Sequence, residues 1–384
     1  MRFFHVSDLH LGLKLINRDL RADQEHILSQ ISALAGEYHP DAVVIAGDIY
    51  DKSIPSAEAV EVFDHFISEL TGMIPDASIM IISGNHDSAA RINCFRSLLS
   101  RQNVHMIGLP PSGPQDYIEK VSLEDDDGIV NFYLLPFVKP SMVKEIVGVS
   151  EEGTNLSYEE SLRRLIGRER LDPTQRNILV SHQFYLPVGK TGDEVERMDS
   201  EVKTVGNIDA VSAQILEAFD YAALGHIHKP MKVGSEYFRY CGTPLACSVS
   251  EAGQPKSLLM VDLGPKGDIK VRELPLSPLR QVRVLRGTLG EILAQRCEDY
   301  VTVILTDRVD LDILDMQDRL RSAFPNLLEI RREGVRQADY SRSYSEEERL
   351  DPFALCCSFL KDIDDEEKAI LRDVIDSISF GGDR

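Results

Sequence analysis

The sequence predicts an α/β layered sandwich, in which two β-sheets are flanked by helices, followed by a small α+β domain and a C-terminal helical tail. Two observations lead to this fold class. Short apolar runs alternate with amphipathic stretches in the N-terminal part, which is typical of strands and helices in succession. After a proline-containing segment that begins near residue 273, a shorter alternation of the same kind starts again, so a second domain is expected there.

The N-terminal alternation predicts strands and helices in turn. The strands are expected at Arg2–Val6, Ala42–Ala46 and Ser78–Ile82, and the helices at Asp19–Glu37, Ser56–Leu70 and Ala89–Leu99. Further strands are expected at Phe132–Leu135, Ile178–Val180, Tyr221–Leu224, Tyr237–Tyr240, Ser257–Asp262 and Ile269–Leu274. Because mostly turns separate the later strands, we expect them to form a second, more antiparallel sheet.

Residues 1–275 are therefore expected to form the large domain. Two prolines in Glu273–Leu279 remove backbone donors and stiffen the chain, which favours a linker there. Residues 280–332 predict a β-α-β-α-β domain, residues 333–350 a polar linker and residues 351–384 the helical tail. The expected elements are Val282–Leu285, Leu289–Gln295, Val301–Leu305, Leu311–Arg321 and Leu327–Ile330, then tail helices Pro352–Lys361 and Glu366–Ile378.

Composition narrows the classes of protein. The 384 residues allow two or three domains, and no apolar run reaches the roughly 18 residues that a membrane-spanning helix needs. No signal-like region precedes the first strand, so the cytoplasm is the expected compartment. The net charge of −21 argues against coating nucleic acid by bulk electrostatics, although bound cations or a partner would supply local positive charge. The scattered cysteines, without CxxC spacing, are expected to be reduced structural thiols.

Polar motifs directly follow five of the expected strands. They are Asp8-Leu-His10, Gly47-Asp48-Ile-Tyr-Asp51, Gly84-Asn85-His86-Asp87, Ser181-His182 and Gly225-His226-Ile-His228. Ligands of α/β sheets bind beyond the carboxyl ends of the strands, so these motifs are expected to converge on one crevice. The other histidines, His5, His26, His39, His65 and His105, lie outside any motif and are expected to be structural.

The donor types in these motifs indicate a binuclear metal site. Oxygen and nitrogen donors without thiolates suit Mn²⁺, and Zn²⁺ and Fe²⁺ are compatible with them. Two ions about 3.5–4 Å apart need a bridging carboxylate. Asp48 is the natural bridge, because the preceding glycine lets the chain turn sharply. In Asp8-Leu-His10 and His226-Ile-His228, residues two apart in an extended segment point the same way.

These motifs, in this order, resemble those of the calcineurin-like metallophosphoesterase superfamily. The stretches HVSDLHLG, DAVVIAGDIYDKSIPS, YAALGHIHKPMKV and RYCGTPLACSVSE resemble more closely the SbcD family of nuclease subunits. This resemblance covers residues 1 to about 275 well and continues more loosely beyond them. It implies the metallophosphoesterase sandwich with a small capping domain.

The resemblance also implies roles for single residues. One ion would be held by Asp8, His10, Asp48 and His228, and the other by Asp48, Asn85, His182 and His226. His86 would be the catalytic acid or transition-state stabiliser near the scissile phosphate. Some relatives carry a second histidine three residues after the bridging aspartate, where this chain has Asp51.

The activity implied by the resemblance is that of a Mn²⁺-dependent DNA nuclease, with 3′-to-5′ exonuclease action on duplex ends and endonuclease action on single strands or hairpins. Its implied partner is an SbcC-type coiled-coil ATPase, gripped by the C-terminal helices. A homodimer within a heterotetramer is expected. The wide apolar arc of helix Ser56–Leu70 fits a dimer contact, and it fits a well-buried core helix equally well. Lys14, Arg18, Arg91 and Arg96 are the basic residues near the motifs that could contact phosphates.

Two alternatives to a nuclease fit the sequence less well. A phosphoprotein phosphatase of the same superfamily would extend the second motif to GDxVDRG and end the third in Glu, whereas this chain has Lys52 after Asp51 and ends the third motif in Asp87. A small phosphodiesterase would have little use for the added domain and tail. A non-catalytic interaction module should have lost several ligands, and all seven are present together with His86.

Overall fold

The computed structural model describes residues 1–187, 189, 198–201, 209–307, 313–333, 367, 368 and 371. The chain forms two compact units, Met1–Glu333 and Gly334–Arg384, and every described strand belongs to the first. The predicted polar linker after residue 333 and nearly all of the predicted tail helices lie outside the described residues.

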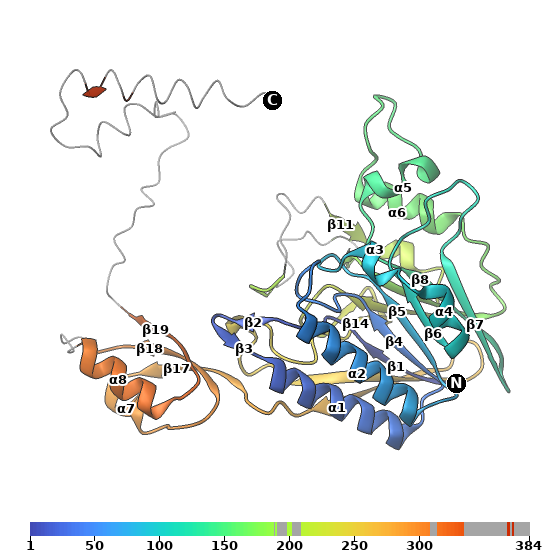
Figure 1. Ribbon diagram of the computed structural model, residues 1–384. Coiled ribbons are helices and arrows are strands. Elements are labelled where there is room, and N and C mark those ends of the chain that lie inside the picture. The colour runs from blue at the N-terminus through green and yellow to red at the C-terminus, as the bar shows by residue number, and fades with distance from the viewer. Residues whose placement is uncertain are drawn as a thin grey trace. The chain divides into compact units, whose positions relative to one another are not determined.

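The first sheet has six strands in the order β16-β15-β1-β4-β5-β6. Figure 1 labels β1, β4, β5 and β6 of this sheet. Strands β1, β4, β5 and β6 run parallel, and β15 and β16 join β1 in antiparallel fashion. The bounds are β1 Arg2–Val6, β4 Ala42–Ala46, β5 Ser78–Ile82, β6 Val104–Ile107, β15 Lys256–Leu263 and β16 Ile269–Leu276. Strand β16 takes in Pro275, so the expected linker is partly wrong. Proline is tolerated there because β16 is an edge strand.

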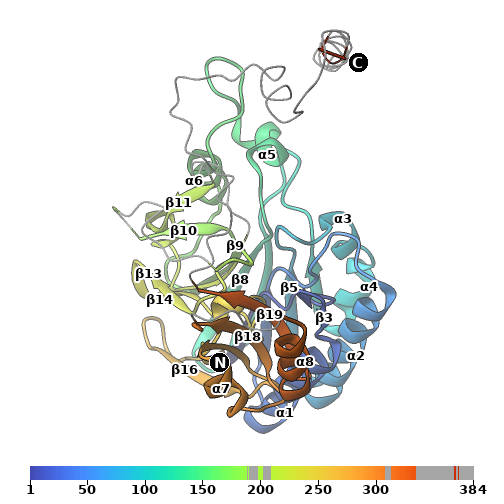
Figure 2. The ribbon, with the colours of Figure 1, turned by 90° about the vertical axis from the view of Figure 1, so that its left-hand side faces the viewer.

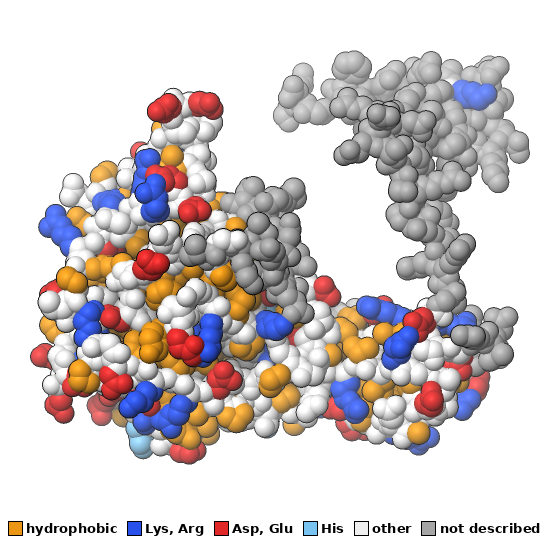
Figure 3. Space-filling model, turned by 180° about the vertical axis from the view of Figure 1, so that it is seen from behind, with side chains coloured by type: hydrophobic (Ala, Val, Ile, Leu, Met, Phe, Trp, Pro, Cys, Tyr) orange, Lys and Arg blue, Asp and Glu red, His pale blue; other side chains and the backbone are white. Residues whose placement is uncertain are grey.

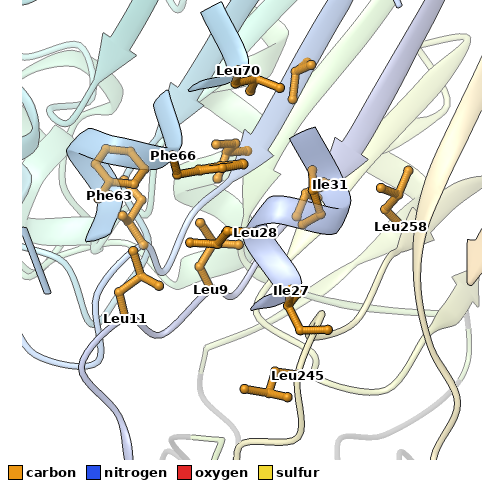
Figure 4. Close-up of a cluster of buried hydrophobic side chains, with 14 of the residues drawn as sticks. Leu9, Leu11, Ile27, Leu28, Ile31, Phe63, Phe66, Leu70, Leu245 and Leu258 are labelled. Carbon is orange, nitrogen blue, oxygen red and sulfur yellow. The ribbon is translucent and has the colours of Figure 1, made fainter. Parts of the chain in front are cut away.

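Helices α1 (Arg21–Tyr38) and α2 (Ala57–Met73) pack on the outer face of this sheet. Figure 4 shows Ile31 and Phe66 pointing into one apolar cluster with side chains from the sheet and its loops. On α2, Val60 and Met73 lie 44% and 47% exposed, outside this contact. The predicted helix Ala89–Leu99 is instead broken into α3 (Ala89–Ile92) and α4 (Arg96–Leu99), because Phe95 adopts a left-handed conformation with φ of 59°.

The second sheet has the order β13-β14-β12-β9-β8-β7. The expectation of a more antiparallel sheet is wrong, since β14, β12, β9 and β8 are parallel and only the edge strands β13 and β7 pair antiparallel. A parallel pair needs a long crossover, and α5 and α6 lie in the one between β8 and β9. The bounds are β7 Glu119–Asp125, β8 Gly128–Leu135, α5 Pro140–Val147, α6 Tyr158–Gly167, β9 Arg176–His182, β12 Tyr221–Gly225, β13 Met231–Val233 and β14 Ser235–Tyr240.

The two sheets face each other across an apolar core (Figure 2). Phe3 of the first sheet meets Phe132 and Tyr221 of the second at ring-centroid distances of 5.4 and 5.5 Å. Helices α5 and α6 cover the far face of the second sheet. The predicted layered sandwich is therefore confirmed. Short strand pairs not predicted from the sequence are β2 Lys14–Leu15 with β3 Arg18–Asp19, and β10 Phe184–Leu186 with β11 Ala210–Ser212.

The small sheet β17-β18-β19 is parallel and has its own apolar core with α7 and α8. Its elements follow the predicted order, as β17 Val282–Gly287, α7 Leu289–Leu293, β18 Tyr300–Leu305, α8 Ile313–Ala323 and β19 Leu327–Arg332. Asp23 of α1 accepts hydrogen bonds from Arg280 at 2.9 Å and Tyr300 at 2.7 Å, which fasten this sheet to the large one. Among the described residues, no helix has the length and apolarity needed to cross a membrane.

Candidate metal centre

The predicted ligands come together at the carboxyl ends of five neighbouring strands. Segments after β1, β4 and β5 of the first sheet meet the ends of β9 and β12 of the second. Among the described residues there are three sets of potential ligands, and within each set the donor atoms lie within 4.8 Å of one another. Two of these sets contain Asp48, as the bridging role requires. The structure thus brings together all eight predicted site residues, namely Asp8, His10, Asp48, Asn85, His86, His182, His226 and His228.

The carboxylate of Asp48 lies between two groups of imidazoles. Its Oδ2 is 3.3 Å from Nε2 of His182 and 3.8 Å from Nε2 of His10. Its Oδ1 accepts a hydrogen bond of 2.8 Å from the backbone N–H of His86. Oδ2 is therefore the oxygen that both groups of imidazoles face.

On one side of Asp48, two imidazoles converge on Asn85. Nε2 of His182 lies 3.1 Å and Nδ1 of His226 lies 2.8 Å from Asn85 Oδ1. His182 donates its Nδ1–H to the carbonyl of Ala46 at 2.7 Å, which fixes the tautomer and turns Nε2 toward the site. These contacts bring together the residues assigned to the second ion.

On the other side, Nε2 of His10 and Nε2 of His228 are 3.1 Å apart. Two neutral imidazole nitrogens without hydrogens would repel, so a proton or a cation has to lie between them. Asp8 Oδ1 lies 4.0 Å from Nε2 of His228, and its two oxygens accept from the backbone N–H of His226. These contacts bring together the residues assigned to the first ion.

Electrostatics indicates that the centre is suited to cations. Burial lowers the pKa of His10 to about 3, so it offers a lone pair at neutral pH. Burial opposes the charge on Asp48, but the neighbouring histidines, His182 first, hold its pKa below the usual range. Burial likewise opposes protonation of His182, yet Asp48 raises its pKa to about 9. A bound ion would take over the role of these protons, and we conclude that the donors fit two divalent ions.

The backbone at the site is strained. Four of the seven predicted ligands have positive φ, with Asp8 at 55°, His10 at 44°, Asp48 at 50° and His226 at 107°. Non-glycine residues rarely adopt such angles, and they gather at functional sites. Gly84 is needed for close approach, because a Cβ there would overlap the carboxylate and backbone of Asp48.

Sequence reasoning assigned no role to Asp87, which fastens two of the motifs together. Its buried carboxylate accepts from the backbone N–H groups of Ile49 at 3.1 Å, Tyr50 at 3.0 Å and Gly84 at 2.9 Å. Asp48 lies between these anchored segments. The acid directly after Gly-Asn-His was the sequence signal for such a residue.

The backbone of Asp51 orients the ring of His86. Position 51 is the one at which some relatives carry a second histidine. Its Nδ1–H donates to the carbonyl oxygen of Asp51 at 2.9 Å, and its ring lies edge-on to His10 at 4.9 Å. Since Nδ1 carries this hydrogen, Nε2 is the atom left to face the site. Asp51 thus orients His86 through its carbonyl, and it also lines a cavity beside the site. Burial raises the pKa of the Asp51 carboxyl group.

A buried polar network behind His228 was also missed. Nδ1 of His228 lies 2.7 Å from the hydroxyl of Ser200, which donates to Glu251 at 3.0 Å. Glu251 also forms a buried ion pair with Lys256 at 2.6 Å and accepts from Thr243 at 2.8 Å. An acid at the end of the apolar block GTPLACSVSE was the available signal, but only the fold places it behind a ligand.

Two cavities flank the centre and both reach Asp51. One, of about 490 Å³, is lined by His10, His228 and, from the small sheet, Glu329 and Arg331. The other, of about 450 Å³, is lined by Lys14, Arg21 and Lys52 among others. Of the basic residues proposed from the sequence, Arg18 instead donates to carbonyls of the small domain and Arg96 pairs with Glu119.

Two family models and a curated relative match the chain. The family model for calcineurin-like phosphoesterases matches residues 1–230, and the model described as the type 5 capsule protein repressor C-terminal domain matches residues 278–363. The chain is 28% identical to the SbcD subunit of the nuclease SbcCD from Staphylococcus epidermidis, over 85% of its own length and 84% of the relative's.

Similar solved structures include GAP50, the anchor in the inner membrane complex of Plasmodium. It is 12% identical, with a TM-score of 0.43 over 86% of this chain and 96% of that one. TT1561 of Thermus thermophilus is 13% identical, with a TM-score of 0.40 over 71% of this chain and 98% of that one.

Proposed function

The chain belongs to the calcineurin-like phosphoesterase family and is a homologue of the SbcD nuclease, and from that premise we propose that it is a Mn²⁺-dependent DNA nuclease. Its reactions would be 3′-to-5′ exonuclease cleavage of duplex ends and endonuclease cleavage of single strands and hairpins. The observation that carries the proposal is the convergence of six further metal-type ligands and His86 around the Asp48 carboxylate.

Two divalent ions at this centre would supply Lewis-acid activation of a phosphodiester and of water near neutral pH. Asp8, His10, Asp48 and His228 would hold one of them, and Asp48, Asn85, His182 and His226 the other. The carbonyl of Ala46 and the Ser200–Glu251 pair keep the imidazoles of His182 and His228 turned toward the ions.

His86 would hold or give a proton at Nε2. The bond from Nδ1 to the carbonyl of Asp51 fixes the ring, so that Nε2 points toward the donors of His10 and Asp48. From there it would protonate the leaving oxygen of the cleaved strand. This is the one predicted site residue assigned to chemistry and not to an ion.

Support for a polymeric substrate comes from the space around the centre. The two cavities that meet at Asp51 leave room for nucleotides on both sides of a scissile phosphate. The net charge of −21 is no obstacle to DNA, because Lys and Arg side chains are interspersed with the acidic ones on the face shown in Figure 3. The small domain, residues 280–332, would help to orient the DNA.

The test is cleavage of end-labelled duplex, hairpin and plasmid DNA by the purified protein. We expect cleavage with Mn²⁺, weaker cleavage with Mg²⁺ and none in EDTA, because imidazole donors favour Mn²⁺ over the harder Mg²⁺. Intact DNA together with rapid turnover of a nucleoside monophosphate would instead favour a phosphatase of the same family.

Two variants separate ligand from catalyst. Asp48→Ala should abolish cleavage and lose at least one ion, whereas His86→Ala should lose cleavage and keep both ions. Metal content per chain, measured after dialysis, is the readout. Loss of metal in His86→Ala would make His86 a ligand.

We further propose that the tail, residues 351–384, binds the coiled-coil base of an SbcC-type ATPase, within an assembly that contains two copies of this chain. The support is the second family model, which reaches residue 363, and the relative's designation as a subunit of SbcCD. Deleting residues 350–384 should abolish co-purification with the ATPase and ATP-stimulated cutting of duplex ends, while Mn²⁺-dependent cleavage of single strands persists. Undiminished partner binding by the truncated chain would refute the assignment.

A further inference from the structure

Cys247 lies beside two of the metal-type histidines. It belongs to the segment between β14 and β15, is 8% exposed and forms no disulfide. One donor atom each from His10, His228 and Cys247 lies within 4.8 Å of the others. Cys247 also lines the cavity that His10 and His228 line. The sequence had indicated a centre without thiolates, and the fold brings one sulfur close to it.

The spacing of these three donors suits a metal ion. Zinc sites have metal–sulfur distances of about 2.3 Å and metal–nitrogen distances of about 2.0–2.1 Å, which places sulfur and nitrogen donors about 3.5 Å apart. Nε2 of His10 and Nε2 of His228 are already 3.1 Å apart. The three donor atoms lie within 4.8 Å of one another, so the sulfur would need to move by about 1.3 Å at most, which a rotation of the side chain supplies.

A second buried cysteine in the same segment shows that burial alone does not produce this arrangement. The sulfur of Cys241 lies 2.9 Å from the hydroxyl of Ser7 and contacts the carbonyl of Gly242. Cys241 belongs to none of the three sets of potential metal ligands among the described residues. It is therefore a matched control for Cys247.

We infer that Cys247 supplies a thiolate to the ion held by His10 and His228, so that this position takes a thiophilic borderline ion, such as Zn²⁺ or Co²⁺, in preference to Mn²⁺. The inference rests on the proposed metal centre and makes its two positions chemically unequal. The position around Asn85 has oxygen and imidazole donors alone, whereas the other gains sulfur. On binding, the S–H bond breaks, its proton passes to solvent and a sulfur–metal bond forms.

The test is the absorption spectrum of the metal-free full-length protein titrated with Co²⁺. A sulfur-to-cobalt charge-transfer band in the near ultraviolet is expected to rise together with the visible bands of bound Co²⁺. Cys247→Ser should lose the charge-transfer band and keep the visible bands, whereas Cys241→Ser should keep both. Competition between Zn²⁺ and Mn²⁺ gives a second readout. The preference for Zn²⁺ should fall at least tenfold in Cys247→Ser, since loss of even an outer-shell partner costs about 10–100-fold in metal affinity.

Two results would overturn the assignment. One is a wild-type spectrum with the visible bands of bound Co²⁺ but no charge-transfer band, which needs no variant to fold. The other is a charge-transfer band that persists in Cys247→Ser or disappears in Cys241→Ser. The spectrum reports ligation and not cleavage. Failure to cut DNA with an intact charge-transfer band would thus refute the proposed nuclease and leave the ligand assignment standing.

Discussion

Glu251 offers the sharpest test of how the protein supports its metal centre. The residue is 2% exposed, and its carboxylate accepts hydrogen bonds from Lys256 at 2.6 Å and from Ser200, the neighbour of His228, at 3.0 Å. The perturbation is Glu251→Gln, which keeps the shape and removes the charge. The substitution should act on stability through Lys256 and on metal binding through Ser200.

The magnitudes follow from these contacts. Leaving one partner of a buried ion pair uncompensated costs about 3–5 kcal/mol. Lys256 keeps two neutral acceptors, Thr243 and Gln254, each at 2.6 Å, so the lower end, about 3 kcal/mol, is expected. Disturbing the partner of a ligating histidine lowers metal affinity by about 10–100-fold.

The assay is urea unfolding in EDTA, together with Zn²⁺ affinity measured against a chelator. Lys256→Met should lose stability but keep most of the metal affinity, because the Ser200–His228 contact stays. The double variant Glu251→Gln/Lys256→Met should regain most of the stability, since both charges are gone, but not the metal affinity. If metal affinity recovers along with stability, Glu251 acts through the fold alone and the reasoning is wrong.

Three further predictions concern the fold around the centre. Arg176 holds the pKa of Asp125 below its usual range, so this pair adds stability above pH about 4 that is lost on acidification. In Asp125→Asn, the free energy of unfolding should therefore fall less steeply as the pH is lowered below about 4. An unchanged pH dependence would contradict this. Asp23→Ala should cost about 1.5–3 kcal/mol per lost bond in urea unfolding, and more than Tyr300→Phe, which loses one of the two bonds. Gly84→Ala should lose metal with little loss of helix signal, because its Cβ would displace the bridging carboxylate; normal metal content would show that the loop adapts.

Much of the candidate site could be predicted because its residues stand where apolar runs end. Strands β1, β4 and β5 have the bounds expected from the sequence, and the motifs after them converge as parallel strands require. The resemblance supplied what spacing cannot, namely the division of the ligands between two ions. That division and the role of His86 stay predictions.

The rest depended on long-range pairing that local patterns do not encode. The order β14-β12-β9-β8 makes the middle of the second sheet parallel. Helices α5 and α6 in the crossover are short, so the spacing of their apolar residues did not reveal them in the sequence. Glu251 and Cys247 reach the centre because β14 and β15 belong to different sheets and their connection crosses the mouth of the site. No local signal marks such a crossing.

Hydrogen bonds within the protein help to hold the strained ligands in place. A non-glycine residue in a sparsely populated backbone conformation costs about 1–3 kcal/mol of folding free energy. Such a conformation persists only where other contacts hold the residue in place. Here the N–H of Asp8 donates to Gly47 at 2.9 Å and that of His10 to Asp48 at 3.0 Å, while Asp87 ties the neighbouring loops. Because these bonds join groups of the protein, they contribute to the order of the loops. Selectivity between the two positions then depends on donor chemistry, which is why a single sulfur at Cys247 would decide which ion the first position prefers.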